Sequence, residues 1–389
     1  MKFFEVVKQS KKSKARLGLL STPHGTVRTP AFVPVATRGT IKAIPPKDIP
    51  DIGIQIAFVN TFHLALHPGG EVLKKFGGIH KYSGLNIPLM SDSAGFQVFS
   101  LGRASERQRR MRTREGDEAL LLGITEEGAR FRSPVDGNEI AFTPEFSMQE
   151  QARIGADIVM AFDECIYYGA SKEYAKKATQ RTHEWLLRCV AAKKIKNPSS
   201  VRSARTFAGK QMLYGIVQGG TYKDLREESA KFVAKQHIDG IAIGGVAVGE
   251  TTKEMKDAVG WVAPYLPPEL PRHLLGIGRL EDIVAFVRQG MDSFDCVELT
   301  RLARNGIVFQ KKGARFERYD LTGTKRLREK DPIEKDCPCY ACRNFSVAFI
   351  HHLFRERELL GYYLATYHNL SFFERAFQDM REKIEQGNL

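Results

Sequence analysis

Three aspartates in this sequence stand at the ends of short apolar runs. They are Asp92, Asp163 and Asp295, and a fourth run of this kind ends in Gln218 followed by Gly219-Gly220. A carboxylate can attack a carbon atom, transfer a proton or accept a hydrogen bond. Carboxylates, an amide and bare glycine backbone together suit a planar heterocycle such as a purine. Chemistry carried at the ends of several strands is typical of an α/β barrel enzyme. We therefore expect these side chains to converge, with Asp295 as the group that attacks.

Each aspartate also has a plainer interpretation, because aspartates at strand ends often cap the helix that follows. Asp292 lies only three residues before Asp295 and is a rival nucleophile on the sequence alone. Gly244-Gly245 ends a further apolar run and offers open backbone of the same kind as Gly219-Gly220. The joint occurrence of these groups favours function over capping.

Eight strand-like runs, most of them near-continuously apolar, are spaced along the chain. They cover Ala31–Ala36, Ile54–Asn60, Ile87–Asp92, Asp157–Glu164, Met212–Gln218, Gly240–Gly244, His273–Gly276 and Ser293–Val297. Such runs are expected of parallel strands buried on both faces. Helical patterns at Lys172–Lys194, Tyr222–Gln236, Thr252–Ala263 and Leu280–Gln289 separate several of them. The alternation predicts an α/β fold, a closed TIM-like (β/α)8 barrel with its site at the carboxyl ends of the strands. An open doubly wound sheet is the alternative, but no GxGxxG follows the first run.

We predict three parts of the chain. Residues 1–310 form the barrel with the catalytic site, 311–370 a basic insertion and zinc-binding subdomain, and 371–389 a C-terminal helix. Helices are expected around 346–360 and near 372–385. Two hairpins are also expected. One includes Leu17–Leu20 and covers an end of the fold, and the other spans 131–142 with its turn at Asp136-Gly137.

Half of the cysteines lie within six positions, as Cys337, Cys339 and Cys342 in a CxCxxC pattern. Three thiolates so close together can wrap one ion, and tetrahedral zinc takes four nitrogen or sulfur ligands. The residues alone leave the fourth ligand open among His351, His352 and His368. A closed Cys3His site is a structural zinc site, which would fold a small element that has no core of its own.

The formal net charge is +14, which favours an anionic partner such as nucleic acid. A surplus that only serves solubility is the alternative. Six arginines lie between Arg103 and Arg114, either in a solvated loop or in a lid that meets phosphates. Eight more basic residues lie between Lys311 and Lys330. The start of the chain has no signal-peptide pattern and no run of 18 apolar residues occurs, so we expect a cytoplasmic protein without a membrane span.

Many spaced motifs together carry a family resemblance. They are Arg28–Thr37, Asn60–Leu64, Asp92–Leu101, Phe162–Cys165, Val217–Gly220, Ala242–Gly245, Ala247–Glu250, Phe294–Val297 and the cysteine cluster. In this order the chain resembles the tRNA-guanine transglycosylases, most closely the bacterial type, almost from end to end. The family is a (β/α)8 barrel with a zinc subdomain inserted near the eighth strand.

The resemblance implies a role for individual residues. Asp295 would be the nucleophile on ribose C1′, and Asp92 the general acid/base. Substrate binding would fall to Asp92, Ser93, Phe96, Gln97, Asp163, Cys165, Gln218, Gly244, Gly245, Val246, Glu250 and Leu275. Arg301, Arg304, Lys311 and Lys312 would contact the RNA. His368, in His368-Asn369-Leu370, would be the fourth zinc ligand.

The resemblance also implies the reaction and its partners. The family exchanges guanine 34 of tRNAs with GUN anticodons, those for Asp, Asn, His and Tyr, for a 7-deazaguanine on the route to queuosine. The exchange passes through a covalent tRNA–enzyme intermediate and needs no nucleotide cofactor. Members commonly work as homodimers. Two alternative hypotheses are a queuine-inserting enzyme and an archaeosine-type enzyme. A further alternative is a non-catalytic subunit that binds zinc and RNA.

The sequence departs from the family pattern at a few positions. Ala94 replaces the first glycine of Asp-Ser-Gly-Gly-Phe-Gln, Val246 follows the glycine pair where leucine is usual, and Leu275 stands where a methionine is usual. These departures concern the substrate rather than the reaction class. Cys165 and Val248 match the bacterial pocket, which favours 7-aminomethyl-7-deazaguanine as the substrate.

Overall fold

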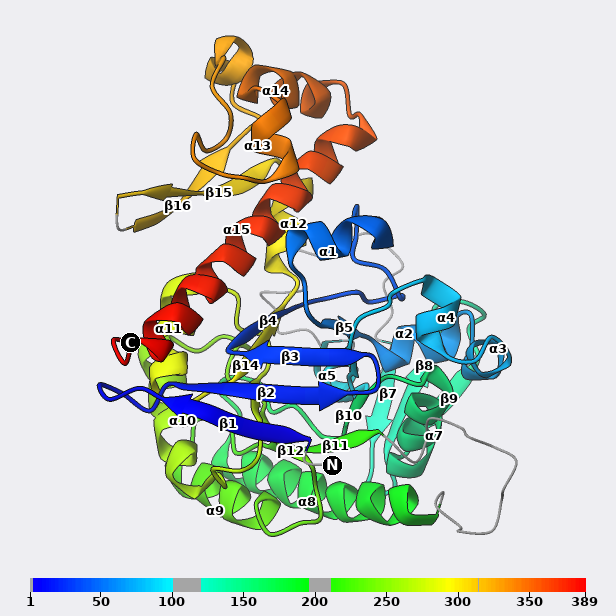
Figure 1. Ribbon diagram of the computed structural model, residues 1–389. Helices are drawn as coiled ribbons and strands as arrows, with labels where there is room; N and C mark the ends of the chain where they lie inside the picture. The colour runs from blue at the N-terminus through cyan, green and yellow to red at the C-terminus, as the bar shows by residue number, and fades with distance from the viewer. Residues whose placement is uncertain (1–2, 101–119, 196–210, 314) are drawn as a thin grey trace.

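Eight parallel strands form one curled sheet at the centre of the molecule. The computed structural model describes residues 3–100, 120–195, 211–313 and 315–389. The strands are β4 (Ala31–Pro34), β5 (Ala57–Val59), β6 (Leu89–Ser91), β10 (Ile158–Met160), β11 (Met212–Val217), β12 (Gly240–Ile243), β13 (Arg272–Leu274) and β14 (Ser293–Cys296). Their order is β4-β14-β13-β12-β11-β10-β6-β5. The two end strands meet through a parallel bridge between Val35 and Phe58, so the predicted (β/α)8 barrel is confirmed (Figure 1).

Helices lie outside the barrel, between successive strands. They are α1 (Ile49–Ile52), α2 (Thr61–Leu66), α3 (Gly70–Lys75), α4 (Ile79–Ser83), α5 (Gly95–Ser100), α7 (Pro144–Ile154), α8 (Lys172–Ile195), α9 (Lys223–Val233), α10 (Thr252–Val262), α11 (Leu280–Arg288) and α12 (Glu298–Arg304), with short 3-10 turns η1 (Pro46–Asp48) and η3 (Ala263–Tyr265). The four helices predicted from sequence are α8, α9, α10 and α11. None of the described helices is long and apolar enough to cross a membrane.

A small antiparallel sheet closes the amino-terminal end of the barrel. It consists of β1 (Phe4–Gln9), β2 (Arg16–Thr22) and β3 (Gly25–Thr29), and β3 leads directly into β4. Phe4, Leu20 and Val27 are buried in one cluster with the residues that fill the barrel interior, such as Met160 and Tyr214. The predicted N-terminal hairpin therefore does cover one end of the fold, which leaves the opposite end for chemistry.

A second small sheet follows β6. It contains β7 (Leu121–Ile124), β8 (Ala129–Arg132) and β9 (Glu139–Phe142), paired antiparallel. The predicted hairpin is formed by β8 and β9, and Gly137 adopts a φ of +76° in its turn. The arginine-rich segment 103–114 lies outside the described residues.

The segment after α12 forms a separate subdomain that stands above the barrel in Figure 1. It contains β15 (Ile307–Lys312), β16 (Arg315–Asp320), η4 (Thr324–Arg328), α13 (Tyr340–Asn344) and α14 (Val347–Arg355). The long helix α15 (Leu359–Glu385) then runs from this subdomain down the side of the barrel. Its Phe377 packs against Phe32 of β4 and Phe294 of β14, both at 6.1 Å between ring centroids.

The predicted boundaries of the last two helices are wrong. The first ends at Arg355 rather than near residue 360, because Arg357 adopts a left-handed φ of +58°. The second begins at Leu359 rather than at Phe372. His368 and Asn369 resemble a polar break in the sequence, but both are fully buried inside α15 and make specific contacts there.

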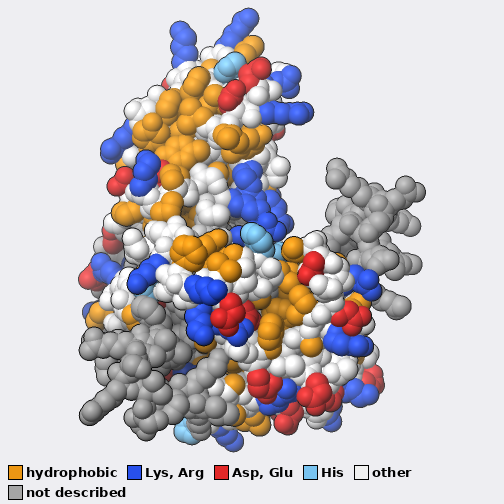
Figure 2. All heavy atoms as spheres, turned by 90° about the vertical axis from the view of Figure 1, so that its right-hand side faces the viewer, with side chains coloured by type: hydrophobic (Ala, Val, Ile, Leu, Met, Phe, Trp, Pro, Cys, Tyr) orange, Lys and Arg blue, Asp and Glu red, His pale blue; other side chains and the backbone are white. Residues whose placement is uncertain are grey.

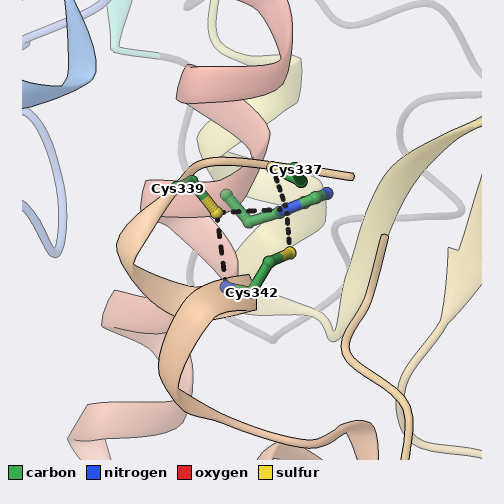
Figure 3. A group of neighbouring side chains, drawn as sticks. Cys337, Cys339 and Cys342 are labelled. Atoms are coloured by element: carbon green, nitrogen blue, oxygen red, sulfur yellow. Dashed lines mark hydrogen bonds between the residues drawn. The ribbon is translucent and has the colours of Figure 1, made fainter. Parts of the chain in front are cut away.

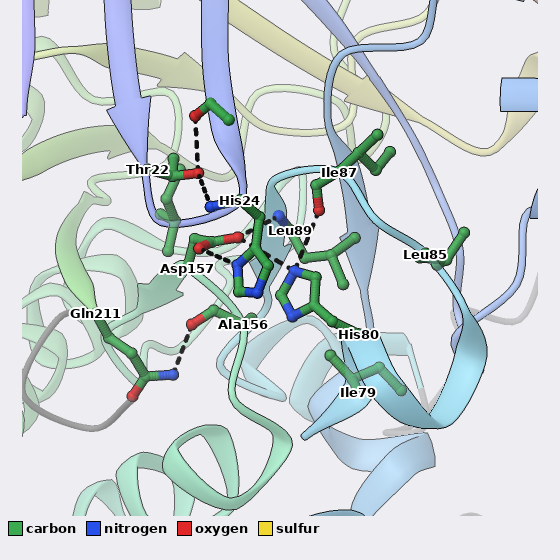
Figure 4. A network of polar contacts seen from close by, with 12 residues as sticks. Thr22, His24, Ile79, His80, Leu85, Ile87, Leu89, Ala156, Asp157 and Gln211 are labelled. Carbon is green, nitrogen blue, oxygen red and sulfur yellow. Dashed lines mark hydrogen bonds and ion pairs between the residues drawn. The ribbon is translucent and has the colours of Figure 1, made fainter. Parts of the chain in front are cut away.

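Asp157 joins three strands at the amino-terminal end of the barrel (Figure 4). Its carboxylate accepts the Leu89 N–H at 2.9 Å and its carbonyl accepts the Met212 N–H at 2.8 Å. His24 Nδ1 lies 2.7 Å from one carboxylate oxygen and His80 Nε2 lies 3.3 Å from the other. Burial acts to raise the pKa of Asp157, but the hydrogen bonds from His80 and His24 outweigh it and leave the pKa below its usual value.

The His24, His80 and Asp157 side chains are close enough together to suggest a metal site. The two imidazole rings, however, are stacked with centroids 3.4 Å apart and planes 9° apart. A metal ion lies in the plane of each imidazole that binds it, and two parallel planes share no such point. His80 Nε2 also lies 3.1 Å from the Ile87 carbonyl oxygen, to which it can donate. The cluster is therefore a hydrogen-bonded anchor between strands.

The depressed pKa of Asp157 predicts an acid-sensitive contribution to stability. The ionised carboxylate stabilises the fold above the pKa of an unfolded aspartate, near 4, and this contribution is lost as the pH falls through the lower folded pKa. We expect Asp157→Asn to lower the free energy of unfolding by about 2 kcal/mol at pH 7, since it weakens charge-assisted hydrogen bonds. In urea titrations from pH 7 to pH 3, the gap between wild type and variant should close on acidification.

The matched control is Asp224→Asn, whose carboxylate makes an exposed ion pair with Lys172. It should change stability little at any pH. A gap for Asp157→Asn that stays constant with pH would contradict the role given to the carboxylate charge.

Candidate active site and metal centre

Asp92 follows β6 at the carboxyl end of the barrel, where the start of α2 holds it. The Thr61 N–H donates to its Oδ1 at 2.7 Å, and the Asn60 amide donates to its Oδ2. Burial outweighs these bonds and raises the pKa of Asp92 to about 7, and the charges of Asp163 and Asp295 add to the rise. Asp92 can therefore give and take a proton near neutral pH. Asp92, Asp163 and Asp295 lie at or just beyond the carboxyl ends of β6, β10 and β14, which belong to one parallel barrel, so all three are at the same mouth.

Asp295 lies near the end of β14 with one oxygen fixed and the other open. Its Oδ1 accepts the Gly276 N–H at 3.0 Å and lies 3.1 Å from His273 Nε2. Its Oδ2 receives no hydrogen bond from the residues that the structure describes. The rival Asp292 lies at the other end of the strand, buried in an ion pair with Arg16 at 2.6 Å. Asp292 is therefore far from any open position at the mouth of the barrel.

Asp163 is buried beside Ser93 and Gln218. The Ser93 hydroxyl donates to Oδ1 at 2.9 Å and the Gln218 amide to Oδ2 at 2.8 Å. Burial raises the pKa of Asp163 to about 6. The backbone after Asp92 passes so close that a Cβ on Gly95 would lie 2.0 Å from Asp163 Oδ1. Ala94, just before it, takes a left-handed φ of +71°, which a glycine adopts at less cost.

Arg226 of α9 is fully buried and holds two glycine loops in place. Its Nε donates to the Gly220 carbonyl at 2.7 Å and its Nη1 to the Gly244 carbonyl at 2.6 Å. Its Nη2 donates to the Gly245 carbonyl at 2.5 Å. The carbonyls of both loops therefore turn inward onto one guanidinium. Arg226 was not predicted as a functional residue, because the charged sequence around it, Lys223-Asp224-Leu225-Arg226-Glu227, is typical of a solvent-exposed helix.

The other predicted substrate-binding residues lie on these same loops. Phe96 is 53% exposed at the start of α5, whereas Gln97 and Val246 are buried. Cys165 is buried after β10, and burial raises the pKa of its thiol. Glu250 accepts the Val248 N–H at 2.8 Å, and Leu275 packs against the residues of the barrel interior.

Positive charge gathers beside this mouth. Arg38 and Lys42 follow β4, and Arg301 and Arg304 lie in α12 directly after β14, the strand that pairs with β4. Burial, then the charges of Arg304, Arg38 and Arg301, lower the pKa of Lys42. Figure 2 shows Lys and Arg side chains gathered between the upper subdomain and the barrel. Arg301 and Arg304 were predicted from the resemblance. Arg38 and Lys42 were missed, although they directly follow the first strand-like run.

The predicted Lys311 and Lys312 are exposed near the end of β15, away from this cluster along the hairpin. A cavity of about 380 Å³ lies between that hairpin and the barrel. Its lining is Gly278, Arg279, Leu280, Glu281, Glu298, Phe309, Phe316 and Arg318. Its lining combines aromatic rings with both basic and acidic side chains, and Arg318 forms an ion pair with Glu298 across it.

Cys337, Cys339 and Cys342 lie around the imidazole of His368, and all four residues are buried (Figure 3). The three sulfurs lie 3.8, 3.6 and 3.3 Å from His368 Nδ1. A tetrahedral ZnS3N centre has sulfur–nitrogen edges of about 3.6 Å. His368 Nε2 lies 2.7 Å from the Phe309 carbonyl oxygen and donates to it, which leaves the Nδ1 lone pair for an ion.

The other histidines that the residues alone left open are elsewhere. His351 Nδ1 is 2.8 Å from the Leu321 carbonyl oxygen, and His352 is exposed. The group that could hold a metal ion is therefore the Cys3His set with His368, as the resemblance implied. It has no position open to a substrate, which is typical of a structural site.

The fold and these groups define a class of protein. It is a (β/α)8 barrel enzyme with converging carboxylates at its mouth, a basic rim, and a buried Cys3His centre in an inserted subdomain. Comparison with known proteins narrows the class, because residues 10–389 match the family described as queuine tRNA-ribosyltransferase.

Similar proteins carry the same description. The chain is 42% identical to the queuine tRNA-ribosyltransferase of Pelotomaculum thermopropionicum, over 99% of this chain and 95% of that one. It is 43% identical to the enzyme of that name from Herpetosiphon aurantiacus, over 96% of this chain and 86% of that one. The chain belongs to the queuine tRNA-ribosyltransferase family, the tRNA-guanine transglycosylases, which are pentosyltransferases.

The buried Arg226 predicts that the two glycine loops depend on one side chain. Arg226→Met keeps most of the aliphatic bulk but leaves several buried carbonyls without a donor. We expect the free energy of unfolding to fall by about 3 kcal/mol or more, as measured by urea denaturation. Purine binding, measured by calorimetry, should be lost or strongly weakened because the loops that line the pocket are no longer held.

Arg188→Met is the matched control, since Arg188 makes a partly exposed ion pair with Glu145 at 2.7 Å. It should cost about 1 kcal/mol or less and leave purine binding intact. Equal effects of the two substitutions would show that Arg226 has no special part in shaping the pocket.

Proposed function

We propose that the protein exchanges guanine 34 of tRNAs with GUN anticodons, those for Asp, Asn, His and Tyr, for 7-aminomethyl-7-deazaguanine. The observation that carries the proposal is the pairing of two different carboxylates at one mouth. Asp295 has a fixed oxygen and an open one, and Asp92 has a pKa of about 7. Family membership supports the reaction class. A tRNA substrate also places the enzyme in the cytoplasm.

The exchange runs as a double displacement. The open oxygen of Asp295 attacks ribose C1′, and the C1′–N9 bond breaks with its electron pair going to the guanine. Asp92 gives its proton to the leaving base, and a covalent tRNA–enzyme ester results. The incoming base then loses a proton to Asp92, attacks C1′ and releases the Asp295 carboxylate. The second half-reaction returns to Asp92 the proton that the first half-reaction used, so no cofactor is needed for the chemistry.

The base pocket fits the edge of a guanine-like ring. Asp163, Gln218 and the backbone at Val246, just after the glycine pair that Arg226 holds, would offer acceptors and donors from buried positions, where an unpaired partner is costly. Phe96 would stack on the ring. Cys165 and Val248 favour the aminomethyl base over queuine, whose cyclopentenediol needs more room. Ser93, Gln97, Val246, Glu250 and Leu275 complete the pocket.

The tRNA would lie across the basic rim. A target base must leave its stack to be reached, at a cost of about a few kcal/mol that an anticodon loop reduces. Arg301 and Arg304, with Lys42 and Arg38, would hold the phosphates around it, and Lys311 and Lys312 would add contacts farther away. Such contacts give affinity that depends on salt.

The Cys3His centre would hold Zn²⁺. Its ligands Cys337, Cys339, Cys342 and His368 have the spacing that a ZnS3N tetrahedron needs. Bound zinc supplies structural cross-linking of the loop before α13 to α15, and takes no part in the exchange. Because members of the family commonly work as homodimers, we propose that this chain also forms a homodimer.

Base exchange tests the proposal directly. Labelled guanine, 7-aminomethyl-7-deazaguanine and queuine are offered to the purified protein with a GUN-anticodon tRNA, and label in the tRNA is counted. We expect guanine and the aminomethyl base to enter position 34, and queuine not to. A tRNA with adenine at that position is the matched control and should take up nothing.

Two results would overturn this. Uptake of no base would refute the enzyme activity, and uptake of queuine in preference would refute the substrate.

Asp295→Asn should also abolish the tRNA adduct that survives denaturation, since an amide is a poor nucleophile. An adduct that persists in this variant would show that another group attacks.

The pKa of Asp92 predicts opposite pH dependences for the two half-reactions. Guanine release needs Asp92 protonated, so its rate constant should fall about tenfold per unit above pH 7. Resolution of the adduct by an incoming base needs the carboxylate, so its rate constant should fall below pH 7. Rapid-quench single-turnover measurements of each step check this. Asp92→Asn should slow both steps and remove both dependences, and identical profiles for the two steps would rule out one shared acid/base.

A further inference from the structure

His273 is a buried polar residue that faces the proposed nucleophile. It lies in β13, paired in parallel with β14, and its register partner is Ser293. Alternate residues of a strand share one face, so Ser293 and Asp295 point to the same side of β14, where the His273 ring meets both. The ring has no exposed surface and stacks on Phe58 of β5, with centroids 5.8 Å apart.

The imidazole bridges the two side chains. His273 Nδ1 lies 2.8 Å from Ser293 Oγ, and Nε2 lies 3.1 Å from Asp295 Oδ1. An ionised carboxylate only accepts hydrogen bonds, so the proton on the ring lies on Nε2. In the neutral ring, Nδ1 is then the acceptor and the Ser293 hydroxyl donates to it. Ser293 thereby fixes the tautomer that presents a donor to Asp295.

We propose that His273 is a positioning residue for the nucleophile, oriented in turn by Ser293; this rests on the exchange reaction proposed above. His273 and the Gly276 N–H, 3.0 Å away, both donate to Oδ1. The carboxylate is therefore held in one rotamer with Oδ2 turned to the open mouth. His273 does not touch the substrate, and it acts only through Asp295.

The same two donors serve both halves of the reaction. When Oδ2 bonds to ribose C1′, Oδ1 becomes the carbonyl oxygen of the ester and keeps its hydrogen bonds. When the incoming base displaces the ester, the electron pair returns to the carboxylate while both donors are already in place. Preorganised donors of this kind need no rearrangement as charge develops.

Two substitutions that introduce side chains of similar length separate the effect of losing the hydrogen-bond donor from the effect of losing side-chain volume. His273→Gln can place an amide N–H where Nε2 was, and His273→Met cannot. The rate constant for forming the denaturation-stable tRNA adduct is measured at saturating tRNA, with tRNA affinity and the melting temperature measured alongside. We expect His273→Met to slow adduct formation about tenfold to a hundredfold, the worth of a hydrogen bond to a charged group. Its affinity for tRNA should stay unchanged, and His273→Gln should recover most of the rate.

The outcomes are distinct. Adduct formation by His273→Met at the wild-type rate, or equal slowing by folded Gln and Met variants, would overturn the positioning role. If the Met variant does not fold, Ser293→Ala takes its place, with a slower adduct expected and an unchanged rate overturning the proposal. Wild-type protein that forms no adduct at all would instead refute the proposed exchange reaction, and this inference with it.

Discussion

The closure of the barrel around β14 is the constraint on which the site depends. β14 pairs with β13 on one side and with β4 on the other, and Asp295 lies opposite Val33 in that register. Because side chains alternate along a strand, a slip of one residue would turn Asp295 from the interior to the helix layer. The bidentate pair of Arg16 with Asp292, at the start of the same strand, fixes the register from the closed end. Asp292 therefore anchors the strand just before it begins, and Asp295 near its other end remains available for the reaction proposed above.

Buried polar groups, rather than apolar side chains alone, line the carboxyl end of the barrel. Asp92, Asp163 and Arg226 are charged or titratable groups that the fold removes from water. Backbone groups bond to Asp92 and Arg226, and the Ser93 and Gln218 side chains bond to Asp163. Such burial is costly unless every group is paired. It also moves the pKa of Asp92 to about 7, a value that a solvated aspartate does not reach. The cost of burying Asp92 in its charged form and its acid/base character near neutral pH thus have one physical cause, the removal of water.

The barrel could be predicted from the sequence because its strands are continuous apolar runs, and the carboxylates because they end those runs. The partners of these acids could not. His273 stands inside a predicted strand and Arg226 inside a charged helix, and nothing in either local pattern shows which way the side chain faces. The start of α15 was misplaced for a related reason. Asn369 is buried inside α15, where its amide nitrogen donates to the Leu299 and Ile307 carbonyls and its amide oxygen accepts the Phe309 N–H. The role of a buried polar residue depends on its contacts with segments that are distant in the sequence. The local periodicity of the sequence contains no information about those contacts.

The position of α15 links the Cys3His group to β4 and β14. His368 lies about one turn above Phe372 and Phe373, and Phe373 packs on Phe32 of β4 at 5.3 Å between ring centroids. Asn369 ties the same turn to the carbonyl of Leu299 in α12, the helix that carries Arg301 and Arg304. α15 thus carries His368 of the Cys3His group within its length, packs on the barrel strands through Phe373 and Phe377, and holds α12 through Asn369. The segment that holds the Cys3His group is therefore connected to the barrel through α15, and through Asn369 to the helix that carries the predicted Arg301 and Arg304.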